Sequence, residues 1–416
     1  MNKKVLIIGL IWPEPEATAA GTRMIQLISF FLSHKYELYF ASAAARNNLS
    51  FSFEALDVKC LSIELNNSDF DSQIKDLDPG IVLFDRFLTE EQYGWRVQEN
   101  CPKAIRVLDT EDLHFLRKSR EIGAKKNSSD WQNYIQNDIT KREIASIFRC
   151  DVSLIISKFE VSLLEKSFQI SPSLLFYLPL LVDSIKIKKM IELPSFRERK
   201  HFMTIGNFKH KPNWDAVRHL RQNIWPTISK QLPQSEMHVF GAYPTEAAKQ
   251  LESKKEGFFI KGWISDKADA FTNYKVCLAP LRFGAGQKGK LLDAMHYGTP
   301  SVTTSIGAEG IAEPENWNGF VTDNEQEFAE IAIRLYSNEA IWLNAQNAGE
   351  KILKTKFDKK QFERELRSKI ENIQLELNEH RSNNFIGSML SHHSLQSTKY
   401  MSKWIESKNL SNDKIV

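Results

Sequence analysis

The sequence lacks any long uninterrupted apolar run. Its longest apolar stretches, such as Val5 to Trp12, are well short of the ~20 residues that a membrane-spanning helix needs. Glycine and proline are also sparse, at 18 and 14 of 416 residues, which excludes collagen-like and low-complexity chains. With 42% apolar and 26% charged residues, the chain has the composition of a folded protein of two or three domains, and we expect no transmembrane span.

Cysteine is rare as well, and the cysteines are dispersed. The four are Cys60, Cys101, Cys150 and Cys277, with no Cys-x-x-Cys pair among them. This spacing excludes a disulfide framework and a cysteine zinc site, and it favours packing thiols in a reducing compartment. We therefore expect a cytoplasmic protein.

Neither sign of charge dominates the chain. The formal net charge is only +3, so the sequence lacks the concentrated basic stripe that nucleic-acid binding requires. The charge is unevenly divided, because residues 1–183 hold 21 Lys and Arg against 25 Asp and Glu, whereas the remainder holds 34 against 27. The second half is therefore the expected host of any small anionic ligand.

Short strand-like segments alternate with helical patterns in the first part of the chain. The first segment is continuously apolar, as strands covered on both faces are. The expected strands are Val5 to Trp12, Leu38 to Ala41, Cys60 to Ile63, Ile81 to Phe84, Ile105 to Leu108, Val152 to Ile156 and Leu174 to Leu178. This alternation predicts a parallel, doubly wound sheet in a first domain over residues 1–184.

The same alternation resumes after a charged stretch that contains Pro194, which we interpret as a linker over residues 185–200. The second set of expected strands is Phe202 to Gly206, Met237 to Phe240, Phe258 to Ile260, Val276 to Leu278, Ser301 to Thr303 and Phe320 to Val321. We expect a second doubly wound domain over residues 201–358 and C-terminal helices over 359–416 that pack back toward the first domain. Ligands of such sheets bind beyond the carboxyl ends of the strands, so the cleft between the domains is the expected site.

Residues 279–300 carry the most informative pattern. A strand ends near Leu281, a glycine-containing loop follows, and a helix is expected to begin near Gln287. Free N–H groups at a helix start, the helix dipole and the ammonium groups of Lys288 and Lys290 would form a seat for phosphate or pyrophosphate. Asp293, one turn further, could accept hydrogen bonds from ribose hydroxyls. The pattern is neither a Walker loop nor Gly-x-Gly-x-x-Gly, and on spacing alone an ordinary loop with solvated lysines is the alternative.

These residues resemble a known family. Residues 284–302 (GAGQKGKLLDAMHYGTPSV) and 307–310 (GAEG) are similar to the donor-binding signature of retaining GT-B glycosyltransferases, the "group 1" bacterial sugar transferases. Residues 205–213 and 261–264 resemble further family positions in the same order, as do several segments of the first half. The resemblance implies an α/β GT-B fold, with two doubly wound Rossmann-like domains facing a central cleft and a C-terminal helical tail.

The resemblance also implies an activity and a set of donor-binding residues. A sugar would pass from a nucleotide-diphosphate sugar to an acceptor hydroxyl with retention of anomeric configuration, in bacterial surface glycan or glycolipid synthesis. The implied donor-binding residues are Gly21, Gly206, Asn207, Lys209, Lys211, Gly262, Trp263, Ile264, Gly284, Gly286, Gln287, Lys288, Gly289, Lys290 and Asp293. Lys288 and Lys290 would neutralise the departing diphosphate, and no Asp-x-Asp motif is present, so no metal and no other cofactor is expected.

A dense polar segment, Asp109 to Arg117, is expected to face the acceptor. His114 could orient or deprotonate a hydroxyl, but the family position usually occupied by His falls nearest Glu111, so either residue is a candidate for catalysis. A helix N-terminus decorated with acids, without chemistry, is the alternative interpretation.

Some positions depart from the family pattern. Gly286 and Asn207 stand where many members carry Glu and Arg, and Asp293 is one methylene shorter than the usual Glu. Two other functions stay open. One keeps the fold and changes the reaction, a nucleotide-sugar epimerase of GT-B fold; the other is a non-catalytic GT-B binding protein, which the departures at Gly286 and Asn207 motivate. The expected partners are a nucleotide sugar and a glycan, glycolipid or other hydroxyl acceptor, without nucleic acid. A peripheral contact with the inner face of the membrane stays open for a lipid-linked acceptor.

Overall fold

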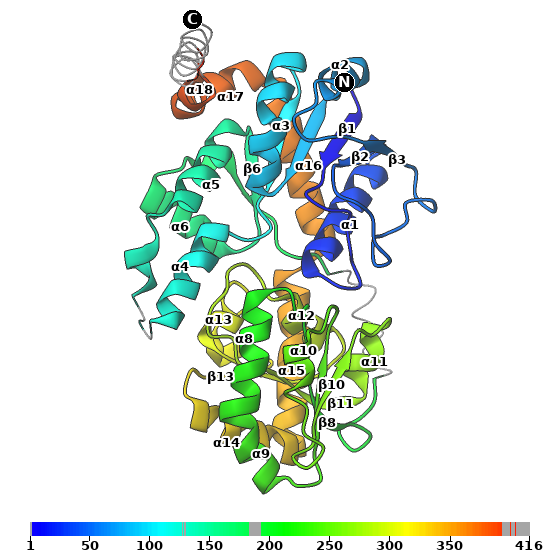
Figure 1. Cartoon of the computed structure of the whole chain (residues 1–416), viewed down its shortest axis with the longest axis vertical. Coiled ribbons are helices and arrows are strands. Elements are labelled where there is room, and N and C mark those ends of the chain that lie inside the picture. Colours follow the sequence, from blue (N-terminus) through cyan, green and yellow to red (C-terminus); the bar gives the residue numbers. More distant parts are fainter. Residues whose placement is uncertain are drawn as a thin grey trace, which may run out of the picture.

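The computed structural model describes residues 2–126, 128, 130–182, 193–392, 400 and 404. Two parallel sheets, each flanked by helices, form two bodies that face each other along the long axis of the molecule (Figure 1). The second half of the predicted linker, residues 193–200, includes the start of the second sheet, whereas residues 185–192 lie outside the described part.

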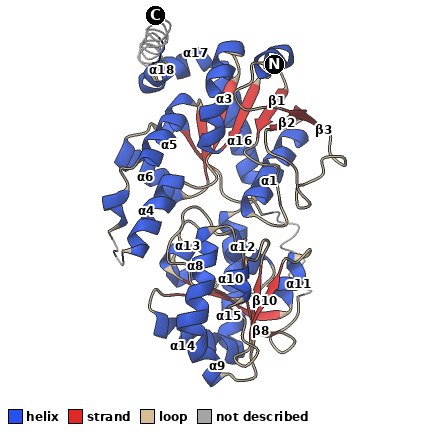
Figure 2. Ribbon diagram, in the orientation of Figure 1, coloured by secondary structure: helices blue, strands red, loops and turns tan. Residues whose placement is uncertain are grey.

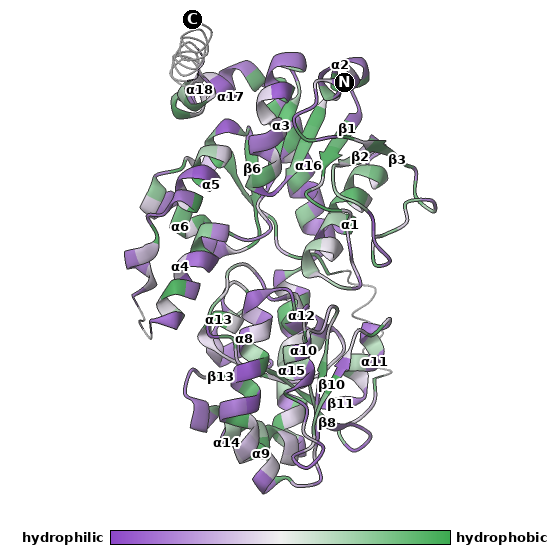
Figure 3. Cartoon of the chain, viewed as in Figure 1, coloured by the Kyte–Doolittle hydropathy of each residue, from purple (hydrophilic) through white to green (hydrophobic). Residues whose placement is uncertain are grey.

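The first sheet has seven strands in the order β3-β2-β1-β4-β5-β6-β7, all paired in parallel. Its strands are β1 (Lys4–Ile8), β2 (Glu37–Ser42), β3 (Val58–Ser62), β4 (Ile81–Asp85), β5 (Ile105–Asp109), β6 (Val152–Ile155) and β7 (Leu175–Tyr177). The helices that cover it are α1 (Ala19–Ser33), α2 (Asp69–Leu77), α3 (Arg86–Asn100), α4 (His114–Lys125), α5 (Asp138–Arg149) and α6 (Lys158–Phe168). Separate apolar clusters lie on its two faces, and the middles of the central strands are accordingly apolar (Figure 3).

The second sheet has six parallel strands in the order β10-β9-β8-β11-β12-β13. Its strands are β8 (Lys200–Ile205), β9 (Met237–Phe240), β10 (Phe258–Gly262), β11 (Tyr274–Ala279), β12 (Ser301–Thr303) and β13 (Gly319–Val321). The helices of this body are α8 (Lys211–His219), α9 (Trp225–Gln231), α10 (Glu246–Lys249), α11 (Lys267–Thr272), α12 (Gly289–His296), α13 (Ser305–Ala308), α14 (Glu325–Ser337) and α15 (Glu339–Lys356). Helices flank the strands of this body as they do those of the first (Figure 2). The strand order reverses direction between β8 and β11, where ligands of doubly wound sheets bind.

After α15 the chain returns to the first body. Helix α16 (Lys359–Leu375) is capped by Asp358, whose side chain accepts the N–H of Lys360. The helix buries Phe362, Leu366 and Ile370 in the apolar cluster that also contains the buried residues of α1. Helices α17 (Leu377–Ser382) and α18 (Phe385–Ser391) follow, and α18 lies against α5. The C-terminal helices therefore complete the first body rather than the second (Figure 1).

The predicted fold class is confirmed, since every expected strand is present within two residues of its predicted ends, apart from the first, which stops at Ile8 instead of Trp12. One sequence-based expectation is wrong. Cys60 is exposed, because β3 is an edge strand with little cover, whereas Cys101, Cys150 and Cys277 are buried as expected. Within the described residues, none of the helices combines the length and apolar character needed to span a membrane.

Candidate functional site

The loop after β11 leads into the N-terminus of α12 at the edge of the second body that faces the first. Helix α12 begins at Gly289, two residues later than predicted, and Lys288 is its N-cap residue. A Cβ atom on Gly289 would lie 2.9 Å from the Cβ of Ala19, at the start of α1. The first turns of α1 and α12 thus meet across the interface, and the positive ends of both helix dipoles face the same region.

Lys290 projects from this first turn of α12. Its Nζ donates to the Oδ1 of Asn213 at 2.8 Å and lies beside Gly206, at the end of β8. Partial burial lowers the pKa of Lys290 to about 8. No described carboxylate forms an ion pair with this ammonium, so the lysine retains the capacity to bind an anion.

Lys288 is the second cation at this helix start. Its Nζ donates to the carbonyl oxygen of Gly286 at 2.8 Å, and burial lowers its pKa to about 8 although Glu309 acts in the opposite direction. Like Lys290, it has no ion pair with a carboxylate in the described part of the chain. The structure therefore brings two half-buried ammonium groups to one helix N-terminus.

The other predicted phosphate-contacting residues have partners of their own. Asn207 accepts the side-chain N–H of Asn213 with its carbonyl oxygen, which joins the loop after β8 to Lys290. The Nζ of Lys209 lies 3.6 Å from the centre of the Tyr243 ring, and Lys211, the first residue of α8, lies 3.5 Å from a carboxylate oxygen of Glu121 in the first body.

The residues predicted to hold the nucleoside lie on two neighbouring elements. Asp293 is partly exposed and forms an ion pair of 3.2 Å with Lys267 of α11. Gly262 ends β10 with a φ of +75°, which favours glycine, and Trp263 next to it is 43% exposed. Ile264 packs into the apolar cluster of the second sheet, so only Trp263 of this segment offers a free aromatic surface.

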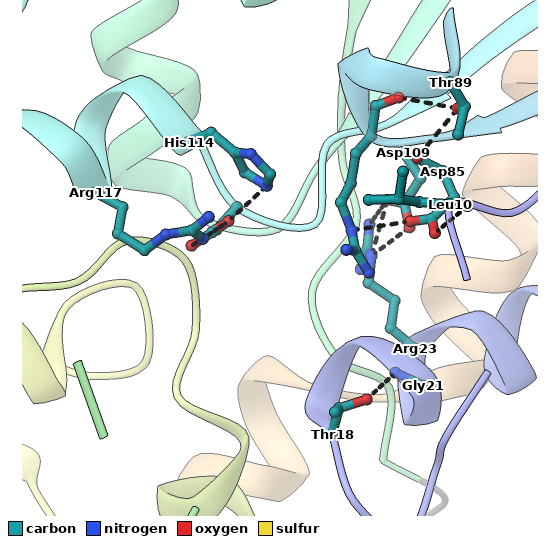
Figure 4. A network of polar contacts seen from close by, with 11 residues as sticks. Leu10, Thr18, Gly21, Arg23, Asp85, Thr89, Asp109, His114 and Arg117 are labelled. Carbon is teal, nitrogen blue, oxygen red and sulfur yellow. Dashed lines mark hydrogen bonds and ion pairs between the residues drawn. The ribbon is translucent and has the colours of Figure 1, made fainter. Parts of the chain in front are cut away.

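In the first body, the carboxyl ends of β4 and β5 carry a buried charged cluster (Figure 4). Arg23 of α1 is 1% exposed; its Nε donates to both Asp109 oxygens, at 2.9 and 3.0 Å, and its Nη1 donates to the Leu178 carbonyl oxygen. Asp109 is thus committed to Arg23 rather than open to an acceptor. Gly21 has a packing role, because a Cβ atom at this position would lie only 2.4 Å from the carbonyl carbon of Glu14.

Glu111 and Arg86 lie next to this cluster. Both adopt left-handed backbone conformations, with φ of +61° and +70°, which are costly for residues with side chains and are concentrated at functional sites. Arg86 pairs with Asp85 at 3.2 Å, and the Oε1 of Glu111 is buried without a hydrogen-bond partner among the described groups. Burial and the charge of Asp109 raise the pKa of Glu111 well above its usual value.

His114 begins α4 and points with Arg117 toward Asp112 (Figure 4). Its Nε2 lies 3.6 Å from Asp112, its ring stands edge-on to Phe87, and burial lowers its pKa to about 3. His210, just before α8 in the second body, completes the group. His210 is exposed at the surface, yet the protein atoms around it and the charge of Arg117 lower its pKa to about 4, and both Asp112 and Lys290 are near enough to act on it.

The remaining predicted residues form the contact between the two bodies. Gln287 is buried; its Oε1 accepts the N–H of Leu180 and its Nε2 donates to the carbonyl oxygen of Gly310. The Gly284 carbonyl oxygen accepts a hydrogen bond from Arg120, and the Gly286 N–H donates to Glu160. In this structure the Gly286 amide, which the sequence suggested for pyrophosphate, is therefore occupied by a side chain of the first body.

Sequence reasoning missed the roles of four residues in this site: Arg86, Arg120, Glu160 and His210. The role of Arg86 could have been suspected from the sequence, because it is a charged residue close behind an apolar strand. Arg120 and Glu160 left no local signal, because their partners lie in the other half of the chain.

The comparisons with known proteins agree with this architecture. Residues 199–338 match the family described as "Glycosyl transferases group 1". No curated protein sequence matches the chain.

Several solved structures are similar in fold. The sucrose-phosphate synthase of Thermosynechococcus elongatus has a TM-score of 0.66 at 13% identity, over 89% of this chain and 99% of that one. HepE of Anabaena, solved with UDP and glucose, has a TM-score of 0.62 at 10% identity, over 89% and 100%. TarM of S. aureus, solved with UDP, has a TM-score of 0.55 at 13% identity over 72% of this chain, which spans only 58% of the length of TarM. The chain therefore has the GT-B fold, and residues 199–338 of its second body match the group 1 glycosyltransferase family.

Proposed function

We propose that the protein is a glycosyltransferase that moves a sugar from a nucleotide-diphosphate sugar to an acceptor hydroxyl, with retention of anomeric configuration and without a metal ion. One observation carries the proposal. Lys288 and Lys290 lie at the N-terminus of α12 without a described carboxylate partner, where the second body meets the strand ends of the first. The match of residues 199–338 to the group 1 family supports it.

Charge neutralisation would be the main contribution of the second body. As the bond from the sugar to the diphosphate breaks, negative charge grows on the leaving oxygens. Two ammonium groups and the N-terminus of α12 are already in place to stabilise it, so little reorganisation is needed. Because these cations suffice for that role, the proposal does not require a metal.

The first body would position the acceptor. Binding both substrates between the two bodies converts a bimolecular reaction into an effectively unimolecular one. Burial raises the pKa of Glu111 and so favours its protonated form, which could donate a hydrogen bond to a sugar oxygen, and neutral His114 could accept one from a hydroxyl. His114 is too weak a base to hold a proton near pH 7, so its proposed role is orientation rather than deprotonation.

The acceptor class that we propose is a glycan or glycolipid of the bacterial surface, reached from the cytoplasm. UDP-glucose is the first donor to test, because HepE of similar fold was solved with UDP and glucose. The purified protein is incubated with the donor, with and without candidate acceptors, and the products are followed by NMR. Transfer that needs an acceptor and keeps the anomeric configuration supports the proposal. Conversion of the donor into an isomeric nucleotide sugar without acceptor identifies an epimerase, whereas a transferase shows at most slow hydrolysis. Binding without conversion of any donor identifies a non-catalytic protein.

A further inference from the structure

Two buried side chains of the first body hold the glycine loop of the second. Glu160, on α6, is fully buried, and its Oε1 accepts the N–H of Gly286 at 2.8 Å. The same oxygen accepts the N–H of Leu113 at 3.3 Å, in the segment that precedes α4. One carboxyl oxygen therefore joins the proposed acceptor segment to the proposed diphosphate loop.

Arg120, on α4, makes the second connection. It is 5% exposed, and its Nη1 donates to the carbonyl oxygen of Gly284 at 2.9 Å. Its Nη1 and Nη2 also form a bidentate pair with Glu309, at 2.8 and 2.6 Å. Glu309 belongs to the loop that follows β12, so Arg120 fixes both glycine-bearing loops of the second body with one guanidinium group.

The backbone of Gly286 is shaped for this contact. Its φ is +63°, and a Cβ on this residue would lie 2.8 Å from the Cβ of Asp112 and 3.2 Å from a methyl carbon of Ile156. A side chain at this position would push the loop away from the first body. Gly286 stands where the resembling family usually carries an acidic residue. In this chain a carboxyl group, that of Glu160, reaches the same position from the opposite side of the interface.

We propose that Arg120 and Glu160 are positioning residues for the glycine loop at 284–289, which they hold in its active arrangement only when the two bodies are in contact. The inference rests on the proposed function, because these contacts can affect turnover only if the protein transfers a sugar. Glu160 and Arg120 themselves touch loop backbone and Glu309, while Lys288 and Lys290 bind the diphosphate. The second carboxyl oxygen of Glu160 is buried without a hydrogen-bond partner in the described structure, and burial raises the pKa of this group to about 7. A buried group with an unsatisfied oxygen is retained at some cost to stability, which favours a functional role.

The test uses the full chain with the variants Arg120→Met, Arg120→Lys and Glu160→Gln. Arg142→Met is the matched control, because it also removes a bidentate pair with a glutamate, Glu91, but lies within the first body away from the loop. Three quantities are measured: kcat with the donor, Kd for UDP by calorimetry, and amide hydrogen exchange over residues 284–289. Arg120→Lys and Glu160→Gln are conservative enough to keep the test valid if Arg120→Met does not fold.

We expect Arg120→Met and Glu160→Gln to lower kcat at least tenfold and Arg120→Lys to lower it less. Because the loop contains Lys288, Kd for UDP should rise in all three, but by a clearly smaller factor than kcat falls. Exchange over 284–289 should accelerate in all three and stay unchanged in Arg142→Met. Wild-type kcat in the variants would overturn the inference, and so would an equal loss of UDP binding and turnover, which would mean direct ligand contact. If wild type neither binds nor turns over a nucleotide sugar, the proposed function fails. If amide hydrogen exchange over residues 284–289 is unchanged in the variants, the positioning role of Arg120 and Glu160 is refuted, whatever the result for the proposed function.

Discussion

The ammonium nitrogen of Lys290 lies 2.8 Å from the Oδ1 of Asn213, a neutral oxygen that leaves the positive charge uncompensated. Asn213 in turn donates to the carbonyl oxygen of Asn207, so the lysine is oriented by the loop after β8. A half-buried cation without a counter-ion is costly unless an anion binds there. This relationship connects the fold of the second body to the function that we propose.

Replacing either lysine at the start of α12 should weaken binding of a nucleoside diphosphate. A hydrogen bond to a charged group contributes about 1.5–3 kcal/mol, so Lys290→Met and Lys288→Met should each raise Kd for UDP about 10- to 100-fold. Lys255→Met, an exposed lysine of the same body, is the control and should bind as wild type does. Calorimetry at fixed salt concentration measures Kd for UDP, and equal affinity in all three variants would refute the proposed diphosphate-binding site.

The same lysines predict how binding depends on pH. Both have pKa values lowered to about 8, so they carry full charge at pH 6.5 and lose it as the pH rises through 8. Affinity for a UDP-sugar should therefore be flat below pH 7 and fall by up to about tenfold per pH unit for each lysine above pH 8. The double variant Lys288→Met and Lys290→Met should show a flat profile. An affinity that rises with pH in wild type would contradict the assignment.

Glu143 predicts a pH dependence of stability. It is buried, accepts the N–H groups of His114 and Phe115 at the start of α4, and has a pKa raised to about 8 by burial. In the unfolded chain the group ionises near its usual pKa of about 4.3, so between that value and 8 the unfolded state is favoured increasingly.

The unfolding free energy of wild type should therefore carry a contribution that falls by up to about 1.4 kcal/mol per pH unit across this window. Urea denaturation of wild type and Glu143→Gln at pH 5, 6, 7 and 8 measures the difference. The variant should lack this part of the slope, and identical slopes in the two proteins would show that Glu143 titrates normally.

The buried pair of Arg23 and Asp109 should be structural. Removing one partner leaves an uncompensated buried charge, which costs about 3–5 kcal/mol. Arg23→Met and Asp109→Asn should both lower the unfolding free energy by this order, measured by chemical denaturation. A loss below 1 kcal/mol together with loss of acceptor turnover would instead make Asp109 part of the acceptor site.

The sheets and the lysines could be predicted from sequence because their signals are local. Fully buried parallel strands are continuous apolar runs, and Val5 to Ile8 of β1 and Ile81 to Phe84 of β4 are such runs. Lys288 and Lys290 follow a glycine loop at a helix start, a pattern contained within a dozen residues. The polar segment around Glu111 and His114 was likewise visible after β5.

The contacts between the two bodies could not be predicted in this way. Glu160 and Gly286 are 126 residues apart, and Arg120 and Glu309 are 189 apart, so no periodicity or motif links them. Sequence patterns fix which face of an element is apolar, but the relative placement of two bodies depends on long-range packing. For the same reason the ion pair between Asp109 and Arg23 could not be predicted, although Asp109 was noted in the polar segment after β5.

The most direct test of the central claim is a thermal and chemical stability screen of wild type against a panel of nucleotide-diphosphate sugars. A ligand that binds only the folded state adds about 2.7 kcal/mol of stability at a concentration 100 times its Kd. We predict that at least one nucleotide sugar stabilises wild type by this order and leaves the Lys288→Met and Lys290→Met double variant unchanged. Equal stabilisation of both proteins, or none of wild type by any member of the panel, would contradict the account.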